Sequence, residues 1–433
     1  MSITPDTIHA NGVVGAGGAG FPTHVKMKSR AEFFILNAAE CEPLLHKDKE
    51  LLHAFPELIL RGIEEARRLV GAERAVVGIK GKYHEVIAAL EPLLPQQTSV
   101  FPLTDTYPAG DEFLLVYDVT GRVIPPGGLP LDVGCVVNNV ETILNLARGV
   151  PVTRKYLTVT GAVRDPVTLC VPIGMSVGEV VQAAGGAAIE QWAVLLNGVM
   201  MGRVCRDLNE PVTKTTGGIY ILPPDHVLIR RHSMTFETIN RIGRSACDQC
   251  SFCTEMCPRY LLGHPIEPHK AMRALGFTME KASLIVGTSY CCECNICTMI
   301  ACPEDLDPRN VCVQDKALVK QMGLKWDGGG REIRPHSMYE HRRTPISRLI
   351  AKLGLQNFRN LGPLREGVVE TGRVRLPLKQ HVGVPCEPLV RVGQQVKEGE
   401  IVAAPPAGQL GAPIHASIGG RVTAVDGAIE ITA

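Results

Sequence analysis

Cysteines between residues 247 and 302 have the spacing in this sequence that is best suited to chemistry. The first block runs Cys247-x-x-Cys250-x-x-Cys253-x-x-x-Cys257-Pro, and the second runs Cys291-x-x-Cys294-x-x-Cys297-x-x-x-x-Cys302-Pro. Thiolates at every third position let a short loop wrap one face of an iron–sulfur cube, while the more distant Cys-Pro reaches a second cube. The two blocks therefore predict two [4Fe–4S] clusters.

Each cluster is expected to take three ligands from one block and the fourth from the other. The expected sets are Cys247, Cys250, Cys253 with Cys302, and Cys291, Cys294, Cys297 with Cys257. The second block has one additional residue before its Cys-Pro, and Cys292 is a second thiol beside Cys291. The ligand there therefore stays open between Cys291 and Cys292.

Zinc sites and disulfides are the alternatives for closely spaced cysteines. A zinc site takes four thiolates from two pairs, whereas each block here offers three closely spaced thiolates and a Cys-Pro. Disulfides are disfavoured because no signal peptide precedes the blocks. The other cysteines are scattered singly, as expected for free thiols in a reducing bacterial cytoplasm.

The length and charge of the chain limit its class. A chain of 433 residues suggests about two to four domains. The formal net charge of +1 gives no field to hold nucleic acid or an anionic membrane. No apolar run approaches the ~18 residues of a transmembrane helix. We expect a soluble multidomain protein that binds phosphate-bearing ligands through local groups.

Residues 1–151 alternate strand and helix patterns. Apolar strands are predicted at 33–37 and 75–79, and helices at 57–70 and 84–94. This βαβ rhythm indicates an α/β domain that binds ligands at the carboxyl ends of its strands. A glycine run at 12–23 precedes the first strand, and its amides could surround a phosphate. By itself the run is also compatible with a plain loop, because it is not the dinucleotide fingerprint Gly-x-Gly-x-x-Gly.

Three motifs make the flavin interpretation specific. They are Gly15-Ala-Gly-Gly-Ala-Gly-Phe-Pro-Thr23 with Lys26, Asn37-Ala-Ala-Glu-Cys-Glu-Pro43, and Val137-Asn-Asn-Val-Glu-Thr142. The first domain resembles the flavin- and NADH-binding subunit of respiratory complex I, and resembles the C subunit of Rnf-type ferredoxin:NAD oxidoreductases more closely. The resemblance implies FMN as cofactor and NADH as electron donor.

The same resemblance implies roles for individual residues. The glycine loop and its lysine would hold the FMN phosphate, the two-Glu loop would approach the nicotinamide nucleotide, and Asn-Asn-x-x-Thr would line the flavin. The implied residues are Gly15, Gly17, Gly18, Gly20, Phe21, Lys26, Asn37, Glu40, Glu42, Asn138, Asn139 and Thr142. Ala16 and Ala39 replace an Arg and an Asp of the complex I pattern, the second as in the Rnf-type pattern, so flavin binding carries over better than the NADH contacts. Segments 107–112 and 120–132 are expected either to shape the flavin pocket or to form turns.

Residues 152–230 change to strand alternation crossed by a short helix at 177–184, the order of a β-grasp module. This part resembles the soluble-ligand-binding β-grasp domain of the same families, some members of which are associated with cobalamin. We expect it to couple the flavin domain to the cluster domain, because no Asp-x-His-x-x-Gly corrinoid motif occurs. His226 and His232 are interpreted as solvated residues and not as ligands.

The remaining parts are a cluster domain at 234–323, a linker with one helix at 324–372, and a strand-rich segment at 373–433. Helices are predicted at 235–244, 267–275, 280–286 and 345–353, and 325–331 reads as polar linker. Short strands with glycine turns predict a C-terminal lipoyl-like barrel-sandwich hybrid. His415-Ala-Ser occupies the hairpin where a carrier lysine would lie, which argues against lipoylation or biotinylation. In the Rnf-type C subunit the matching segment is amino-terminal, so this chain looks circularly rearranged.

The expected fold class is therefore multidomain α/β plus α+β. It comprises a Rossmann-like flavin domain, a β-grasp domain, a helical ferredoxin-type domain with two [4Fe–4S] clusters, and a barrel-sandwich hybrid. That order resembles, over nearly the whole chain, the cobalamin reductases of bacterial propanediol-utilisation microcompartments.

This resemblance implies an enzyme that takes hydride from NADH onto FMN and passes single electrons through the clusters to cob(III)alamin and cob(II)alamin. It also implies cobalamin as substrate, a corrinoid adenosyltransferase and microcompartment proteins as partners, and a cytoplasmic location inside a microcompartment. Hydride transfer to flavin needs no protein acid or base, so no catalytic side chain is assigned.

Two other hypotheses stay open from the sequence. A subunit of an Rnf-type NADH:ferredoxin oxidoreductase would share every cofactor but work in a membrane complex. A non-catalytic electron-transfer scaffold would keep the clusters and lose the nucleotide site. FMN release together with NADH-dependent cob(I)alamin formation would separate the three.

Overall fold

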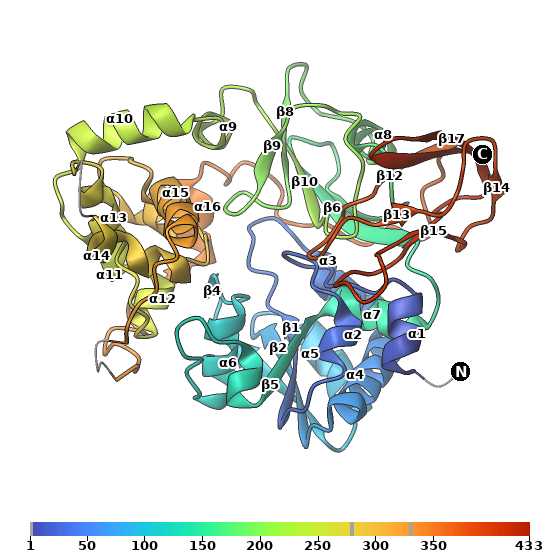
Figure 1. Ribbon diagram of the computed structural model, residues 1–433, viewed down its shortest axis with the longest axis horizontal. Coiled ribbons are helices and arrows are strands. Elements are labelled where there is room, and N and C mark those ends of the chain that lie inside the picture. Colours follow the sequence, from blue (N-terminus) through green and yellow to red (C-terminus); the bar gives the residue numbers. More distant parts are fainter. Residues whose placement is uncertain (1–2, 278–280, 329–331) are drawn as a thin grey trace.

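The computed structural model describes residues 3–277, 281–328 and 332–433. In Figure 1 these residues form an N-terminal α/β unit, a mixed-sheet unit, a helical cysteine unit and a C-terminal β unit. The helical cysteine unit lies at one end of the molecule, and the C-terminal β unit lies between the mixed-sheet unit and the start of the chain.

The N-terminal α/β unit is built on a four-stranded parallel sheet in the order β3-β2-β1-β5. The strands are β1 (Phe33–Ala38), β2 (Arg74–Lys80), β3 (Thr98–Leu103) and β5 (Cys135–Asn139). The chain runs outward from β1 to β3 and then returns to place β5 on the other side of β1. That reversal creates a crevice at the carboxyl ends of β1 and β5, which is where open α/β sheets bind ligands.

Helices cover both faces of this sheet. The core on one face is shared with α4 (Pro56–Val70), α5 (His84–Leu90) and α7 (Val140–Arg148), and the core on the other face with α6 (Glu112–Thr120). In α4 the buried Ile59, Ile63, Ala66 and Val70 recur at helical spacing. The helix predicted at 57–70 is therefore confirmed to within one residue, as are the strands predicted at 33–37 and 75–79.

The predicted end of the second helix was wrong. α5 stops at Leu90 and a 3-10 turn, Glu91–Leu93, follows it. Pro92 accounts for the change, because proline has no N–H to continue an α-helix. The sequence prediction also missed other elements of this unit. These are the strands β3 and β5, the helices α6 and α7, and the short elements α1 (Pro5–Ala10), α2 (Thr23–Lys26), α3 (Lys47–Ala54) and β4 (Thr106–Tyr107).

The mixed-sheet unit has five strands in the order β7-β6-β10-β8-β9. They are β6 (Arg154–Gly161), β7 (Val167–Pro172), β8 (Ala193–Leu196), β9 (Arg203–Cys205) and β10 (Gly218–Leu222). Only β6 and β10 pair in parallel. α8 (Val177–Ala183) packs on this sheet through Val177, Val180 and Val181, as the predicted helix required.

The helical cysteine unit is made of short helices joined by tight loops. They are α9 (Val227–His232), α10 (Phe236–Ala246), α11 (Phe252–Glu255), α12 (Pro258–Leu261), α13 (Pro268–Ala274), α14 (Ala282–Ile285), a 3-10 turn (Val286–Tyr290), a π-turn (Cys297–Ala301) and α15 (Pro308–Gln321). The helix predicted at 280–286 starts at a residue outside the described ranges, and its described part contains α14.

Residues 324–372 are here called the connector. β11 (Thr344–Pro345) pairs with β4 of the N-terminal unit, and α16 (Ile346–Lys352) follows at the predicted place. Further along, the N–H of Val369 donates to the carbonyl of Cys170 in β7. The connector is thus packed against two units; of the predicted polar linker at 325–331, residues 329–331 lie outside the described ranges.

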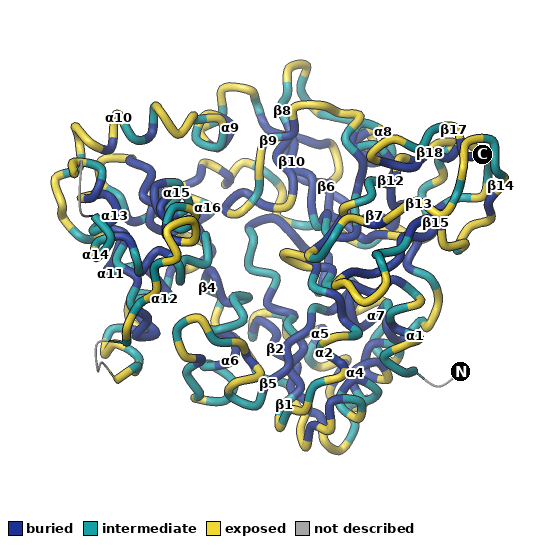
Figure 2. The backbone as a smooth tube through the Cα atoms, viewed as in Figure 1, coloured by how far each residue is buried: buried dark blue, intermediate teal, exposed yellow. Residues whose placement is uncertain are grey.

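The C-terminal β unit consists of two small sheets, β12-β18-β17-β14 and β13-β15-β16. The strands are β12 (Arg373–Pro377), β13 (Glu387–Pro388), β14 (Gln395–Val396), β15 (Ile401–Ala404), β16 (Ile414–His415), β17 (Gly420–Val425) and β18 (Ala428–Thr432). Their core is continuous with that of the N-terminal unit, and Figure 2 shows buried backbone running between the two. His415, Ala416 and Ser417 are all buried, so this turn is not an exposed attachment site.

Within the described ranges, none of the helices has the length and apolar character needed to cross a membrane.

Candidate functional site

The glycine loop, residues 12–23, lies at the amino end of α7. Val14 bridges Pro22, and the N–H of Gly15 donates to the carbonyl of Phe21 at 2.9 Å, which closes the loop. Gly18 and Gly20 have φ of 68° and 75°, a left-handed conformation that glycine adopts without steric cost. The loop tip at 17–19 is exposed.

The sequence-predicted Asn139 and Thr142 lie beside this loop. The N–H of Ala16 donates to the Thr142 hydroxyl at 2.9 Å, and a Cβ built on Gly17 would lie 3.5 Å from the side-chain amide of Asn139. The side chain of Asn139 also caps α7 by accepting from the N–H of Glu141. The structure therefore brings the first and third predicted motifs together at the crevice between β1 and β5.

Lys26, Asn37 and Asn138 surround the same crevice. Lys26 Nζ donates to the carbonyl of Val137 at 2.9 Å and pairs with Glu112 at 3.1 Å. Asn37 donates to the carbonyl of Gly110 at 2.9 Å, so the 107–112 segment borders the crevice. Asn138 is buried, and its side-chain N–H₂ finds no acceptor among the described residues.

The carboxylates of the two-Glu loop, Glu40 and Glu42, bond to backbone groups outside the glycine loop. Oε2 of Glu40 accepts from the N–H of Asp48 at 2.8 Å, at the start of α3, and burial together with the nearby Asp48 raises the pKa of Glu40 to about 8. Both carboxylate oxygens of Glu42 accept backbone N–H groups, from Met200 and Met201, at 3.0 Å. Burial raises the pKa of Glu42 to about 7. Glu42 is thus directed at the mixed-sheet unit and not at the glycine loop.

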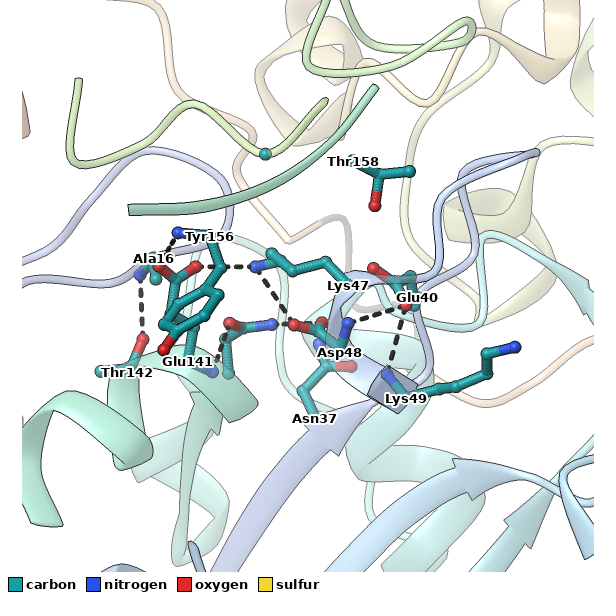
Figure 3. Close-up of polar contacts among 12 residues, drawn as sticks. Ala16, Asn37, Glu40, Lys47, Asp48, Lys49, Glu141, Thr142, Tyr156 and Thr158 are labelled. Atoms are coloured by element: carbon teal, nitrogen blue, oxygen red, sulfur yellow. Dashed lines mark hydrogen bonds and ion pairs between the residues drawn. The ribbon is translucent and has the colours of Figure 1, made fainter. Parts of the chain in front are cut away.

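A buried charge network, absent from the sequence predictions, joins these elements (Figure 3). Glu141 is fully buried, accepts from Lys47 at 3.0 Å and from the N–H of Tyr156 at 2.9 Å, and also pairs with Lys155. Asp48 pairs with Lys47 at 3.1 Å. The network therefore ties α3 and α7 of the N-terminal unit to β6 of the mixed sheet.

The charges in this network balance one another. Burial lowers the pKa of Lys155 to about 8, while Glu141 opposes that shift. Burial alone would raise the pKa of Glu141, but Lys155 and Lys47 hold it below its usual range. The sequence signal was the place of Lys155 directly before the strand-like run 156–161, and in the structure all residues from 155 to 161 are buried.

Neighbouring thiols follow the order that the predicted crossing requires, with Cys302 beside the first block and Cys291 and Cys292 beside Cys257, while the ligand sets themselves remain a prediction. The pKa of Cys253 is raised to about 12, mainly by burial and also by the neighbouring thiols of Cys247, Cys250 and Cys302. We call these four cysteines the outer set, because Cys250 is exposed and Cys247 and Cys302 are half-buried.

We call the buried cysteines Cys257, Cys294 and Cys297 the inner set. Burial, followed by the thiols of Cys291, Cys257 and Cys253, raises the pKa of Cys297. Cys292 contacts Cys294, and the buried Cys312 of α15 contacts Cys291. Both Cys291 and Cys292 lie beside the inner set, so the ligand there remains a prediction.

The two cysteine loops share one backbone conformation. Gln249 and Ser251 flank the middle cysteine of the first block, with φ of 60° and 67°. Glu293 and Asn295 flank that of the second, with φ of 61° and 69°. Non-glycine residues rarely adopt this conformation, and it concentrates at functional sites. The same strain at equivalent positions indicates two loops shaped for the same ligand.

The inner set faces the N-terminal unit. Tyr107 is buried, and its hydroxyl donates to the carbonyl of Cys294 at 2.8 Å. The side-chain amide of Asn295 donates to the carbonyl of Met200 at 2.9 Å, on the residue whose N–H is held by Glu42. One direct bond, and one bond that passes through Met200 of the mixed-sheet unit, therefore connect the second cysteine loop to the flavin side of the molecule.

The residues present fit the expected cofactors. The unpaired amide of Asn138 and the exposed glycine tip are groups that a flavin and its phosphate would satisfy. The cysteines of the two blocks supply eight thiolates, the donor chemistry that two [4Fe–4S] cubes take. Among the described residues, no group of three or more His, Cys, Asp or Glu side chains is arranged to hold a metal ion.

The other sequence-predicted residues have structural roles. His226 caps α9 by accepting from the N–H of Leu228, and Nε2 of His232 lies 2.8 Å from the carbonyl of Val199. Both histidines are half-buried and hydrogen-bonded within the chain, so the expectation that they are solvated was wrong. Phe21 is half-buried in the glycine loop.

Comparisons with known proteins agree with this arrangement. Family models match along the chain: the Nuo51 FMN-binding domain at 8–148, the SLBB domain at 156–204, the 4Fe-4S dicluster domain at 246–307 and the RnfC barrel sandwich hybrid domain at 366–432. These matches confirm the predicted FMN and [4Fe–4S] domains and the carboxyl-terminal place of the hybrid domain.

Three relatives illustrate the similarity. Cobalamin reductase PduS of Salmonella typhimurium is 44% identical over 98% of this chain and 96% of its own length. Cobalamin reductase PduS of Citrobacter freundii is 42% identical over 97% and 94%. The C subunit of the Na(+)-translocating ferredoxin:NAD(+) oxidoreductase complex of Acetobacterium woodii is 35% identical over 58% of this chain and 56% of its own length. With such similarity along almost its entire length, the chain belongs to the cobalamin reductase PduS family.

Proposed function

We propose that this protein is an NADH-dependent cobalamin reductase that uses FMN and two [4Fe–4S] clusters to reduce cob(III)alamin and cob(II)alamin to cob(I)alamin. Family membership over 98% of the chain supports this function. The single observation that carries it is the hydrogen bond from Tyr107 to Cys294, which connects the predicted flavin pocket to a cysteine set within one chain.

The N-terminal unit supplies the residues for the flavin. The exposed amides of Gly17 and Gly18, with Lys26, would hold the phosphate, and Asn138, Asn139 and Thr142 would line the ring. Lys26 pairs with Glu112 and donates to the carbonyl of Val137. To contact the phosphate, it would exchange one of these partners.

The cysteine unit supplies the cluster ligands. We assign the outer cluster to Cys247, Cys250, Cys253 and Cys302, and the inner one to Cys257, Cys291, Cys294 and Cys297. Bound FMN would take up a hydride, a two-electron equivalent, and release electrons singly, while each cube would carry one. Apolar side chains shared between the units, including Met299, Leu195 and Tyr220, keep water from the inner set.

We assign a coupling role to the mixed-sheet unit, as predicted. Its turn at 199–201 is held by Glu42 from the flavin side and by Asn295 from the cluster side. Tyr220 adds a third link, since its hydroxyl donates to the carbonyl of Pro43 at 2.6 Å. These contacts support a spacer that fixes distance between the two redox halves, with domain limits near 151, 230, 323 and 372.

A corrinoid adenosyltransferase and microcompartment proteins remain proposed partners, and the cytoplasm, inside such a compartment, remains the proposed location. Cob(I)alamin is a strong nucleophile that is readily reoxidised. A reaction that alkylates it at once, such as adenosyl transfer, is the class that must consume this product.

The proposal is tested with anaerobically purified protein that carries its flavin and iron. NADH should produce cob(I)alamin from cob(II)alamin, seen by its absorption spectrum, and Cys294→Ser should abolish that product. NADH oxidation without any cob(I)alamin would contradict the proposed substrate.

A further inference from the structure

The back of the glycine loop is held by units that follow much later in the chain. Nζ of Lys155, on β6 of the mixed-sheet unit, donates to the carbonyl of Ala16 at 3.1 Å. The N–H of Val382, in the C-terminal β unit, donates to the carbonyl of Ala19 at 3.1 Å. The exposed tip at 17–19 therefore lies between two carbonyls that are fixed from outside the N-terminal unit.

A third contact fixes the entry of the loop. Lys214 is buried, and its Nζ donates to the carbonyl of Gly12 at 2.7 Å and to that of Pro413 at 2.8 Å. It thus joins the glycine loop, the mixed-sheet unit and the C-terminal β unit at one point. Both acceptors are neutral carbonyls, and burial lowers the pKa of Lys214 to about 7.

Close packing at Gly20 completes this back wall. A Cβ built on Gly20 would lie 2.7 Å from Cγ2 of Thr215 and 2.9 Å from Cβ of His381. The loop therefore approaches the mixed-sheet and C-terminal β units as closely as a glycine allows, and it has no room to rotate toward them.

These contacts determine where the loop amides point. In a planar trans peptide the C=O of one residue and the N–H of the next point in opposite directions. Because Lys155 holds the Ala16 carbonyl at the back, the N–H of Gly17 faces the front. In the part of the chain that the structure describes, the N–H groups of Gly17, Gly18 and Ala19 have no hydrogen-bond acceptor. Consecutive free amides of this kind form an anion-binding concavity.

We infer that Lys155, Lys214 and the N–H of Val382 are positioning groups that keep the glycine-loop amides turned toward the flavin phosphate. FMN binding by the N-terminal unit then depends on the mixed-sheet unit and on the C-terminal β unit. This inference rests on the proposed FMN site and extends it to residues outside the flavin-domain motifs.

The test compares FMN with riboflavin, which lacks the phosphate. Full-length protein stripped of flavin is titrated with each ligand, and binding is followed by flavin fluorescence. Lys155→Met and Lys214→Met should each weaken FMN binding about tenfold or more, the scale of one lost charge-assisted interaction, and leave riboflavin binding nearly unchanged. Lys397→Met, which removes an exposed lysine of the C-terminal β unit, should change neither.

Hydrogen exchange on the unaltered protein gives a second readout that does not depend on a variant folding. FMN should slow amide exchange both in residues 12–23 and in residues 378–384 of the C-terminal β unit, and riboflavin should slow it in neither. An unchanged ratio of FMN to riboflavin affinity in both variants, or protection by FMN confined to residues 12–23, would overturn the inference. Failure of the unaltered protein to bind FMN at all would instead overturn the proposed function.

Discussion

The hydroxyl of Tyr107 donates a 2.8 Å hydrogen bond to the carbonyl of Cys294, and the tyrosine is buried where this bond forms. Tyr107 belongs to β4, which pairs with β11 of the connector. The connector therefore supports the strand that carries Tyr107, so the geometry of this bond does not depend on one flexible loop.

Removing the Tyr107 hydroxyl should slow electron transfer without changing the chemistry at either end. In Tyr107→Phe the Cys294 carbonyl loses a buried donor, which costs about 1–3 kcal/mol of stability and loosens the cysteine loop. Rapid-mixing absorbance should show flavin reduction by NADH at the normal rate and slower bleaching of the clusters. Tyr117→Phe, on α6, is the matched control, and equal cluster rates in both variants would contradict this role.

The two cysteine sets should differ in what their loss does. Cys250→Ser, in the exposed outer set, and Cys294→Ser, in the buried inner set, should each lower the iron content from about eight to about four atoms per chain. NADH should still reduce the remaining cluster in Cys250→Ser but not in Cys294→Ser, because only the inner set adjoins the flavin side. Paramagnetic resonance of NADH-treated samples checks this.

Cys205→Ser removes a buried thiol of β9, outside both sets, and is the control for the serine substitutions. It should retain all the iron. The proposed order, in which electrons reach the inner cluster before the outer one, would be wrong if the inner cluster stays oxidised in Cys250→Ser while the outer cluster is reduced in Cys294→Ser.

Glu42 should make stability depend on pH. Burial raises its pKa to about 7 from a usual value of 4.5, so the folded protein binds a proton that the unfolded chain releases in this window. Stability from this group is thus fully present below pH 4.5 and is lost as pH rises toward 7. Melting temperatures between pH 5 and 8 should fall less steeply in Glu42→Gln than in the unaltered protein. An identical slope in both would show that Glu42 does not hold the proton.

Breaking the buried charge network should be costly. Glu141→Gln leaves Lys47 and Lys155 without their shared carboxylate, and loss of one partner of a buried ion pair costs about 3–5 kcal/mol. Urea unfolding followed by circular dichroism measures the change. Asp165→Asn breaks an exposed ion pair with Arg359 and should cost less than about 1 kcal/mol. Equal losses in the two variants would mean that the network is not a stabilising centre.

Local patterns in the sequence predicted a large part of this arrangement. Helical spacing in α4 and the apolar run of β1 act within one element, so both could be read directly. The cysteine spacing was equally informative, because a loop that wraps a cube needs thiolates at fixed intervals whatever surrounds it. The same rule predicts that Cys257 and Cys302 cross to the other block's cluster, and that crossing remains a prediction.

Contacts between units could not be read in the same way. Glu141 and Lys155 lie on α7 and β6, and only the packing of two units makes them partners. Glu42 stands in a motif shared with NADH-binding proteins, yet its direction is decided by free N–H groups at Met200 and Met201. The connector residues that pair with β4 and β7 carried only weak strand signals, since two-residue strands have no periodicity.

The most direct test of the account is an anaerobic titration with NADH, followed by absorbance and paramagnetic resonance, of protein with a measured flavin and iron content. The account predicts one FMN and about eight iron atoms per chain, reduction of both clusters by NADH, and cob(I)alamin on addition of cob(II)alamin. A flavin that NADH reduces while both clusters stay oxidised would contradict it.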